Sequence, residues 1–232
     1  MTDMKIIAIA GGLLASATLL SGCGLGAIAH PDNKDTVTYQ VKDKVQKLQL
    51  RSGSGDVVVT ESDAPYVSVT ETLYWNNDKP RTGHKVAGDT LSLSYDCQRS
   101  WGSCGVDYKV EIPKGLQVDL DAGSGDMTLR SLTGPLDLTA DSGDIVGNGL
   151  GGKKVVAAAE SGNINLRYAA APDSVELSAD SGDVALTVPD GAYDVSTKVD
   201  SGDEHISVKD DNSSPRKLSL TADSGDITVS AG

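Results

Sequence analysis

Residues 175–186 read VELSADSGDVAL, and this pattern decides the fold. Apolar and polar residues alternate on both sides of the central Ser181-Gly182-Asp183. Alternation with a period of two predicts two short strands, each with one buried face and one solvated face. Glycine adopts positive φ without penalty, and Ser and Asp side chains hydrogen-bond to nearby backbone. The central motif therefore predicts a tight corner between the two strands.

The same corner recurs along the chain. Identified by its last residue, it occurs at Asp56, Asp126, Asp144, Asn163, Asp183, Asp203 and Asp226. From Asp126 onward the spacings are 18, 19, 20, 20 and 23 residues. A period near twenty is typical of solenoids, because one unit cannot bury its apolar side alone whereas stacked units can. The sequence therefore predicts an all-β, β-helix-like solenoid of repeats of about twenty residues. An antiparallel β-sandwich is the alternative, since it also has short strands separated by turns.

Two regions depart from the regular repeat. Glu204 and His205 interrupt the apolar alternation after Asp203, and Asp56 precedes Asp126 by far more than one period. We interpret residues 87–91, AGDTL, as a degraded corner in that interval. The folded body is expected at residues 36–232. It divides into an irregular part at 36–112, with strands near 36–41, 45–50, 56–60, 66–72, 90–95 and 107–112, and a regular part at 113–232.

The N-terminus has the features of a secretory leader. The apolar run at residues 6–20 is too short for a membrane-spanning helix. The LSGC at residues 20–23 resembles the lipobox of bacterial lipoproteins, in which the cysteine thiol receives a diacylglycerol before cleavage. This resemblance implies a signal peptide at 1–22, a lipidated Cys23 that anchors the protein to membrane lipid, and a tether at 23–35. It places the body on the extracytoplasmic face of the cell membrane. An ordinary leader with a chance cysteine is the alternative.

The other two cysteines, Cys97 and Cys104, are expected to form a disulfide, because thiol pairs outside the cytoplasm oxidise. The bond would close a short loop between two strands and stabilise the fold by about 2–3 kcal/mol. A metal-binding pair is the alternative, although no further ligand is near in sequence.

The composition limits the core and the partners. The chain has no Phe and 4% aromatic residues, so Val, Leu, Ile and Ala must fill a narrow interior. A net charge of −13 argues against nucleic acid as a partner and against electrostatic adherence to anionic lipid.

Stacked corners would align their acidic residues in a row. Like charges about 5 Å apart repel by roughly 1 kcal/mol in water, so the row needs compensation. Backbone hydrogen bonds to each carboxylate would supply it. The alternative is a cation ladder of Ca²⁺ along Asp56, Asp126, Asp144, Asn163, Asp183, Asp203 and Asp226, since Ca²⁺ takes six to eight oxygen ligands.

The aromatic residues gather in the irregular part, at Tyr66, Tyr74, Trp75, Tyr95, Trp101 and Tyr108. We expect them to cap the open end of the stack, with binding of a glycan or protein as the alternative. No serine, histidine or cysteine stands in a recognisable catalytic or metal motif, so we predict that the protein is not an enzyme.

The repeated GSGDV and DSGDI corners between Val/Leu strands, together with DYKVEIP at residues 107–113, resemble the bacterial DUF4097 "putative adhesin" family. The resemblance covers roughly residues 36–231. It implies a solenoid-like all-β domain in an envelope protein, without a defined ligand or catalytic residues. The resulting prediction is a cell-surface lipoprotein that acts as a non-catalytic interaction module toward a surface protein or glycan. The alternatives are an envelope-stress accessory protein that binds a membrane sensor, and a carbohydrate-active enzyme.

Overall fold

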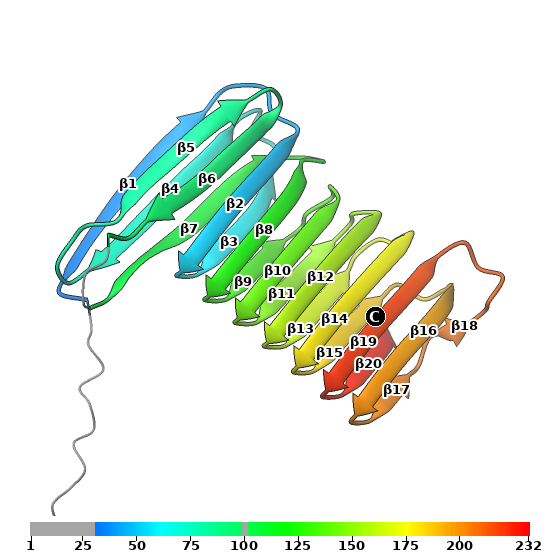
Figure 1. Cartoon of the computed structure of the whole chain (residues 1–232). Coiled ribbons are helices and arrows are strands. Elements are labelled where there is room, and N and C mark those ends of the chain that lie inside the picture. The colour runs from blue at the N-terminus through cyan, green and yellow to red at the C-terminus, as the bar shows by residue number, and fades with distance from the viewer. Residues whose placement is uncertain (1–30, 99–101) are drawn as a thin grey trace, which may run out of the picture.

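The protein is all-β in the computed structural model, which describes residues 31–98 and 102–232. Within these residues, twenty strands form two ten-stranded sheets that face each other across one apolar core (Figure 1). In the same part of the chain, no helix is long and apolar enough to cross a membrane. Cys23, the predicted lipidation site, lies outside the described residues.

The strand order of both sheets departs from the order of the chain. The first sheet runs β1 (Asn33–Val41), β4 (Val67–Trp75), β7 (Cys104–Pro113), β3 (Val57–Ser62), β9 (Met127–Arg130), β11 (Ile145–Leu150), β13 (Ile164–Tyr168), β15 (Val184–Val188), β20 (Ile227–Ala231) and β17 (Glu204–Ile206). The second sheet runs β18 (Lys209–Asp210), β16 (Ala192–Ser201), β19 (Lys217–Ser224), β14 (Ser174–Ser181), β12 (Lys154–Ser161), β10 (Leu136–Ser142), β8 (Gln117–Ser124), β2 (Lys47–Ser54), β6 (Thr90–Asp96) and β5 (Arg81–Ala87).

Each regular repeat is one flattened coil. A strand of the second sheet leads into a Ser-Gly-Asp corner, a strand of the first sheet follows, and a return connection starts the next coil. Neighbouring coils pair in parallel and in register, so that Leu138 lies beside Leu120 on one side and Ala157 on the other. The prediction of a solenoid is therefore confirmed. We call the side that carries the corners the corner edge, and the opposite side the loop edge.

The core consists of rows of equivalent residues from successive coils. The last inward residue before the corner is an alanine in five coils, and all five are at most 3% exposed: Ala122, Ala140, Ala159, Ala179 and Ala222. A small side chain fits there because the two sheets join at the corner. Larger apolar residues fill the row directly after the corner, namely the fully buried Met127, Ile145, Ile164, Val184 and Ile227.

The irregular N-terminal part contains coils of the same stack. The β2–β3 coil lies directly beside the β8–β9 coil, with Val57 paired to Met127. The long interval between these coils in the sequence is an insertion whose strands β4–β7 stack on the other side of β2–β3. Here β6 and β7 form one more coil, and the disulfide Cys97–Cys104 closes the loop that replaces its corner, with Cα atoms 6.1 Å apart.

Three details of this part differ from the sequence prediction. Strand β1 begins at Asn33 rather than at residue 36, and strand β5 was not expected. Residues 87–91 are not a degraded corner. Gly88 and Asp89 form the turn of the antiparallel β5–β6 hairpin at the loop edge, where Gly88 has a φ of 62°. We call β1 and β4–β7 the head of the stack.

The opposite end, the tail, consists of β16–β18, and it is not the end of the chain. The β19–β20 coil, which comes last in sequence, lies between the β14–β15 coil and the β16–β17 coil (Figure 1, red between yellow and orange). The last two coils therefore stack in the reverse of their order in the sequence.

The polarity of the inward residues explains this order. The β19–β20 coil turns only apolar residues inward, and they are at most 1% exposed: Leu218, Leu220, Ala222, Ile227 and Val229. The β16–β17 coil has Thr197 and Glu204 at inward positions, and Thr197 Oγ1 donates a hydrogen bond of 3.0 Å to Glu204 Oε2. Burying these polar groups between two coils would be costly. At the tail they keep contact with solvent and close the core.

Paired cysteines will test this coil order. Ser178 is the register partner of Thr221, which pairs in turn with Lys198. In a Cys23→Ser background, Ser178→Cys with Thr221→Cys should form a disulfide under mild oxidation, because adjacent strands bring Cα atoms within bonding range. Ser178→Cys with Lys198→Cys should stay reduced, since two strand spacings separate the sites by roughly 10 Å. Thiol titration distinguishes the pairs, and the reverse result would restore stacking in sequence order.

Candidate functional site

The corner residues form a continuous hydrogen-bonded row along the corner edge, which we call the corner ladder. In each step the backbone N–H of one corner residue donates to the side-chain Oδ1 of its neighbour in the stack. The donor–acceptor pairs are Asp56 to Asp107 (3.0 Å), Asp126 to Asp56 (3.0 Å), Asp144 to Asp126 (2.9 Å), Asn163 to Asp144 (2.8 Å), Asp183 to Asn163 (2.9 Å), Asp226 to Asp183 (2.9 Å) and Asp203 to Asp226 (2.8 Å).

In this ladder the side-chain oxygens of the corner residues accept hydrogen bonds from backbone N–H groups. Asn163 shows that the acceptor need not be charged, because its Oδ1 receives the Asp183 N–H while its Nδ2 donates to Asp144 Oδ1 at 3.1 Å. Among residues 31–98 and 102–232, no three His, Cys, Asp or Glu side chains lie close enough together to hold a metal ion. The structure brings the predicted corner residues together in one hydrogen-bonded row.

The glycine of each corner is required for two reasons. Gly143 has a φ of 142°, which side-chain-bearing residues rarely adopt. A Cβ at this position would also overlap the carbonyl oxygen of Gly125 in the neighbouring coil. The corners can therefore stack at the spacing of paired strands only if every one contains glycine.

Sequence reasoning missed one member of the ladder. Asp107 accepts the N–H of Asp56 from the β6–β7 coil, whose corner has been replaced by the disulfide loop. The sequence signal for Asp107 is weak. Gly105-Val106-Asp107 contains a glycine and an aspartate but lacks the Ser-Gly-Asp motif of the other corners.

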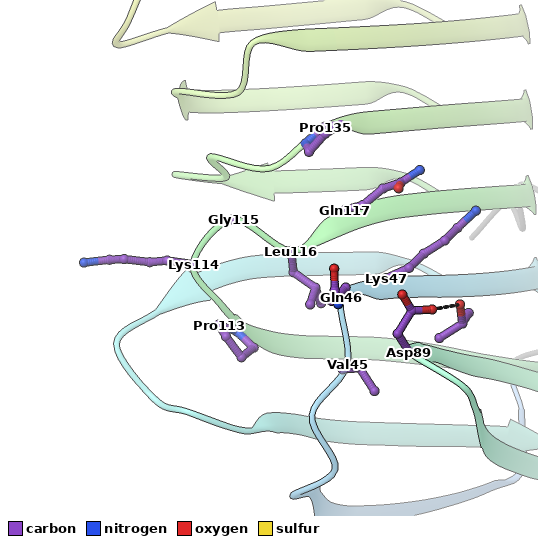
Figure 2. A pocket seen from close by; sticks show the side chains of 11 residues that line it. Val45, Gln46, Lys47, Asp89, Pro113, Lys114, Gly115, Leu116, Gln117 and Pro135 are labelled. Carbon is purple, nitrogen blue, oxygen red and sulfur yellow. Dashed lines mark hydrogen bonds between the residues drawn. The ribbon is translucent and has the colours of Figure 1, made fainter.

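A second feature is a pocket of about 470 Å³ at the loop edge, where the head meets the regular coils (Figure 2). Leu116 and Gln46 extend toward each other inside it, whereas Lys114 extends away. Its lining comes from the β1–β2 connection, the β5–β6 turn, the β7–β8 connection and Pro135. Backbone hydrogen bonds hold these segments together, including Gln117 N–H to the Gln46 carbonyl at 3.0 Å.

The two lysines of this pocket are engaged in ion pairs. Lys47 Nζ lies 2.7 Å from Asp119, and Lys114 Nζ lies 2.6 Å from Asp63. Burial opposes ionisation of Asp119, but hydrogen bonds from Lys47 and Arg51 hold its pKa below the ordinary value. The hydrogen bond between Lys114 and Asp63 raises the pKa of the lysine and lowers that of the carboxyl.

The chemistry of the pocket is accordingly limited. Its lining residues include one carboxylate, from Asp89, and no serine, cysteine or histidine. This lining includes the Thr90 hydroxyl, which donates a hydrogen bond of 3.4 Å to the Asp89 carboxylate. It offers amide and apolar contacts to a small group.

Polar side chains also close the head. The rings of Tyr39 on β1 and His84 on β5 stack with centroids 4.6 Å apart, and thereby connect the edge strands of the two sheets. Tyr39 donates a hydrogen bond of 2.7 Å to the buried Glu71, and burial together with this bond raises the pKa of Tyr39. Tyr108 is buried and Trp75 packs against the core, while Trp101 lies outside the described residues.

The sequence as a whole matches the model of one protein family, Toastrack DUF4097, over residues 42–231. The chain belongs to the Toastrack DUF4097 family. The residues that predicted this family, the Ser-Gly-Asp corners, are those that form the corner ladder of the Toastrack domain. No curated protein matches the sequence.

Several solved structures resemble this Toastrack domain. A "putative cell adhesion protein" from Clostridium sporogenes is 12% identical, with a TM-score of 0.49 over 86% of this chain and 100% of its own. A "putative adhesin" from Bacteroides fragilis is 18% identical, with a TM-score of 0.46 over 85% of this chain and 97% of its own. A "putative lipid binding protein" from Parabacteroides distasonis is 12% identical, with a TM-score of 0.33 over 88% and 98%.

The contribution of the ladder can be measured at Asp183. Asp183→Ala removes the acceptor of the Asp226 N–H and should lower the free energy of unfolding by about 1–2 kcal/mol. Asp183→Asn should lose less than about 0.5 kcal/mol, because an amide oxygen accepts the same bond, as at Asn163. Asp180→Ala is the matched control, an exposed carboxylate of the same corner. Equal urea unfolding midpoints for Asp183→Ala and Asp180→Ala would contradict this role.

Proposed function

We propose that this Toastrack protein is a lipid-anchored, non-catalytic interaction module on the extracytoplasmic face of the cell membrane. The observation that carries the proposal is the position of Cys23, ten residues before the first strand of a body that is closed at both ends. Polar contacts between the sheets close the head at Tyr39–His84 and the tail at Thr197–Glu204. The module therefore presents sheet faces and edges to a partner.

The two outer faces differ in chemistry. That of the second sheet carries charged side chains, many of them acidic: Lys47, Asp119, Asp137, Asp141, Lys154, Glu160, Glu176, Asp180, Lys198 and Asp200. That of the first sheet carries mostly short uncharged side chains beside the corners: Val58, Thr128, Val146, Asn165, Ala185 and Thr228. Binding to the first sheet costs less free energy than binding to the second, because short uncharged side chains lose little conformational entropy and little hydration when a partner covers them.

A shallow hollow on the first sheet supports this choice of face. It has a volume of about 310 Å³, and Val146, Asn165 and Ala185 form its floor beside the ladder residues Asp144 and Asp183. The amide and carboxylate groups can hydrogen-bond to hydroxyl or amide groups of a surface glycan or protein. The adhesin function of the family resemblance is consistent with this arrangement.

The anchor is tested by the mass and the location of the mature protein. Wild-type protein should sediment with membranes and carry the added mass of a diacylglycerol on Cys23, whereas Cys23→Ala should leave the membrane fraction as an unmodified chain. A wild-type protein with the mass of an unmodified polypeptide would overturn the proposal.

The binding face is tested by crosslinking in cells followed by identification of the partner. Asn165→Arg with Ala185→Arg should abolish capture, because it fills the hollow, while Thr139→Arg with Ser178→Arg on the second sheet should leave capture unchanged. Capture of envelope glycan or of a surface protein supports adhesion, and capture of a membrane sensor supports a signalling role instead. Loss of capture in both double variants, with unchanged melting temperatures, would contradict the choice of face.

A further inference from the structure

The chain joins the body at one defined place, the corner edge of the head. Asn33 Nδ2 donates hydrogen bonds of 3.3 Å to the carbonyl oxygens of Trp75 and Asn76, and Asn76 Nδ2 donates to Asp32 Oδ2 at 3.0 Å. These bonds fix the first described residues against the end of β4.

Aromatic rings and lysines gather at the same place. Lys34 Nζ lies 5.1 Å from the ring centroid of Tyr74, and Lys79 Nζ lies 5.4 Å from that of Trp75. Lys79 also pairs with Asp35. We call Lys34, Tyr74, Trp75 and Lys79 the N-terminal patch. Tyr74 and Trp75 extend from opposite faces of β4, with Trp75 packed against the core, and each ring has one ammonium group beside it at the end of the strand.

A largely apolar pocket adjoins the patch. It has a volume of about 550 Å³ and is lined by Pro31, the Tyr74 ring, Cys104 and the backbone of Gly55 and Gly105. The last residues before the folded body thus form part of the wall of a hollow that can accept an apolar or amphipathic group.

We propose that the N-terminal patch and this pocket rest on the headgroup layer of the membrane. The inference rests on the proposed function, because it requires the lipid on Cys23. Pro31 is the eighth residue after Cys23, so Pro31 stays within about 26 Å of the anchor even if that segment is fully extended. Trp and Tyr rings favour the boundary between water and hydrocarbon, and lysines extend their ammonium groups to lipid phosphates.

The rest of the corner edge is unsuited to this contact. Beyond the head it carries the corner ladder and a second row of exposed acids, at Asp141, Glu160, Asp180, Asp200 and Asp223. Carboxylates lose hydration near a bilayer and are repelled by anionic lipid. The head is thus the end that contacts lipid, while the stack extends away from the membrane and holds the first-sheet face in solution.

The depth of Trp75 tests this orientation. Lipidated full-length protein with Trp101→Phe contains Trp75 as its one tryptophan. It is reconstituted in phosphatidylcholine vesicles with or without a lipid that bears a nitroxide on its headgroup. Trp75 should lose at least about half of its fluorescence to the nitroxide, because its ring lies at the interface. The matched control carries Trp75→Phe, Trp101→Phe and Lys198→Trp. Its tryptophan lies on the tail, eight strand spacings or roughly 40 Å along the stack, and should keep its fluorescence.

Vesicle flotation distinguishes failure of the anchor from failure of the orientation. Protein that does not float with the vesicles would overturn the lipid anchor, and this inference with it. Protein that floats but shows equal quenching at Trp75 and at the Lys198→Trp site would overturn the orientation alone. Strong quenching of Trp75 together with unquenched control protein supports it.

Discussion

The structure depends on the contact between one corner and the next. At each corner a glycine without a side chain lets the neighbouring carbonyl approach, and a carboxylate or amide oxygen then receives the backbone N–H of the adjacent coil. These two requirements fix both the spacing and the register of the coils. A shift by one residue would place a Cβ against a carbonyl and leave an N–H without its acceptor, while turning every apolar row to solvent. The acidic residues that give the surface much of its charge therefore form part of the frame.

The way in which the two ends are closed also follows from the stacking of the coils. Inner coils bury their inward residues on both sides, so those positions must be apolar, whereas an end coil keeps one side in water. The coil with Thr197 and Glu204 occupies the tail, and the apolar coil that follows it in sequence fills the place inside. At the head, an insertion reverses the chain direction, and Tyr39 and His84 join the sheets. Both ends consequently present polar groups.

Much of this architecture could be predicted from local sequence. The period near twenty and the alternation beside each corner predicted the solenoid, because both are imposed by contacts that repeat in every coil. The order of the last two coils could not be obtained from the spacing of the corners along the sequence, because that spacing does not show which coil lies beside which. It could have been obtained from Thr197 and Glu204, whose polar side chains at inward positions mark a coil that needs solvent on one side. Strand β5 and Asp107 escaped prediction because the insertion replaces a corner with a disulfide loop, and no repeat motif remains there.

The candidate site was also predictable in part from the sequence. The ladder residues were identified from sequence, and the structure adds the direction of each hydrogen bond and the identity of each partner. The N-terminal patch was not predicted, because it unites residues from β1, β4 and the connection after β4. With the lipid anchor that we propose at Cys23, the N-terminal patch and the short side chains beside the corners of the first sheet describe a rigid spacer that presents one surface away from the membrane.

Amide hydrogen exchange tests the central claim most directly, because it reports on the backbone N–H groups that form the ladder. The amides of Asp126, Asp144, Asn163, Asp183 and Asp226 belong to corners at the edge of the stack, where an unbonded N–H would exchange rapidly. The account predicts that they exchange as slowly as those of the buried strand residues Leu138 and Leu177, through global unfolding only. Exchange as fast as that of the exposed Lys44 in the β1–β2 connection would show that the corners are not joined, and would contradict the account.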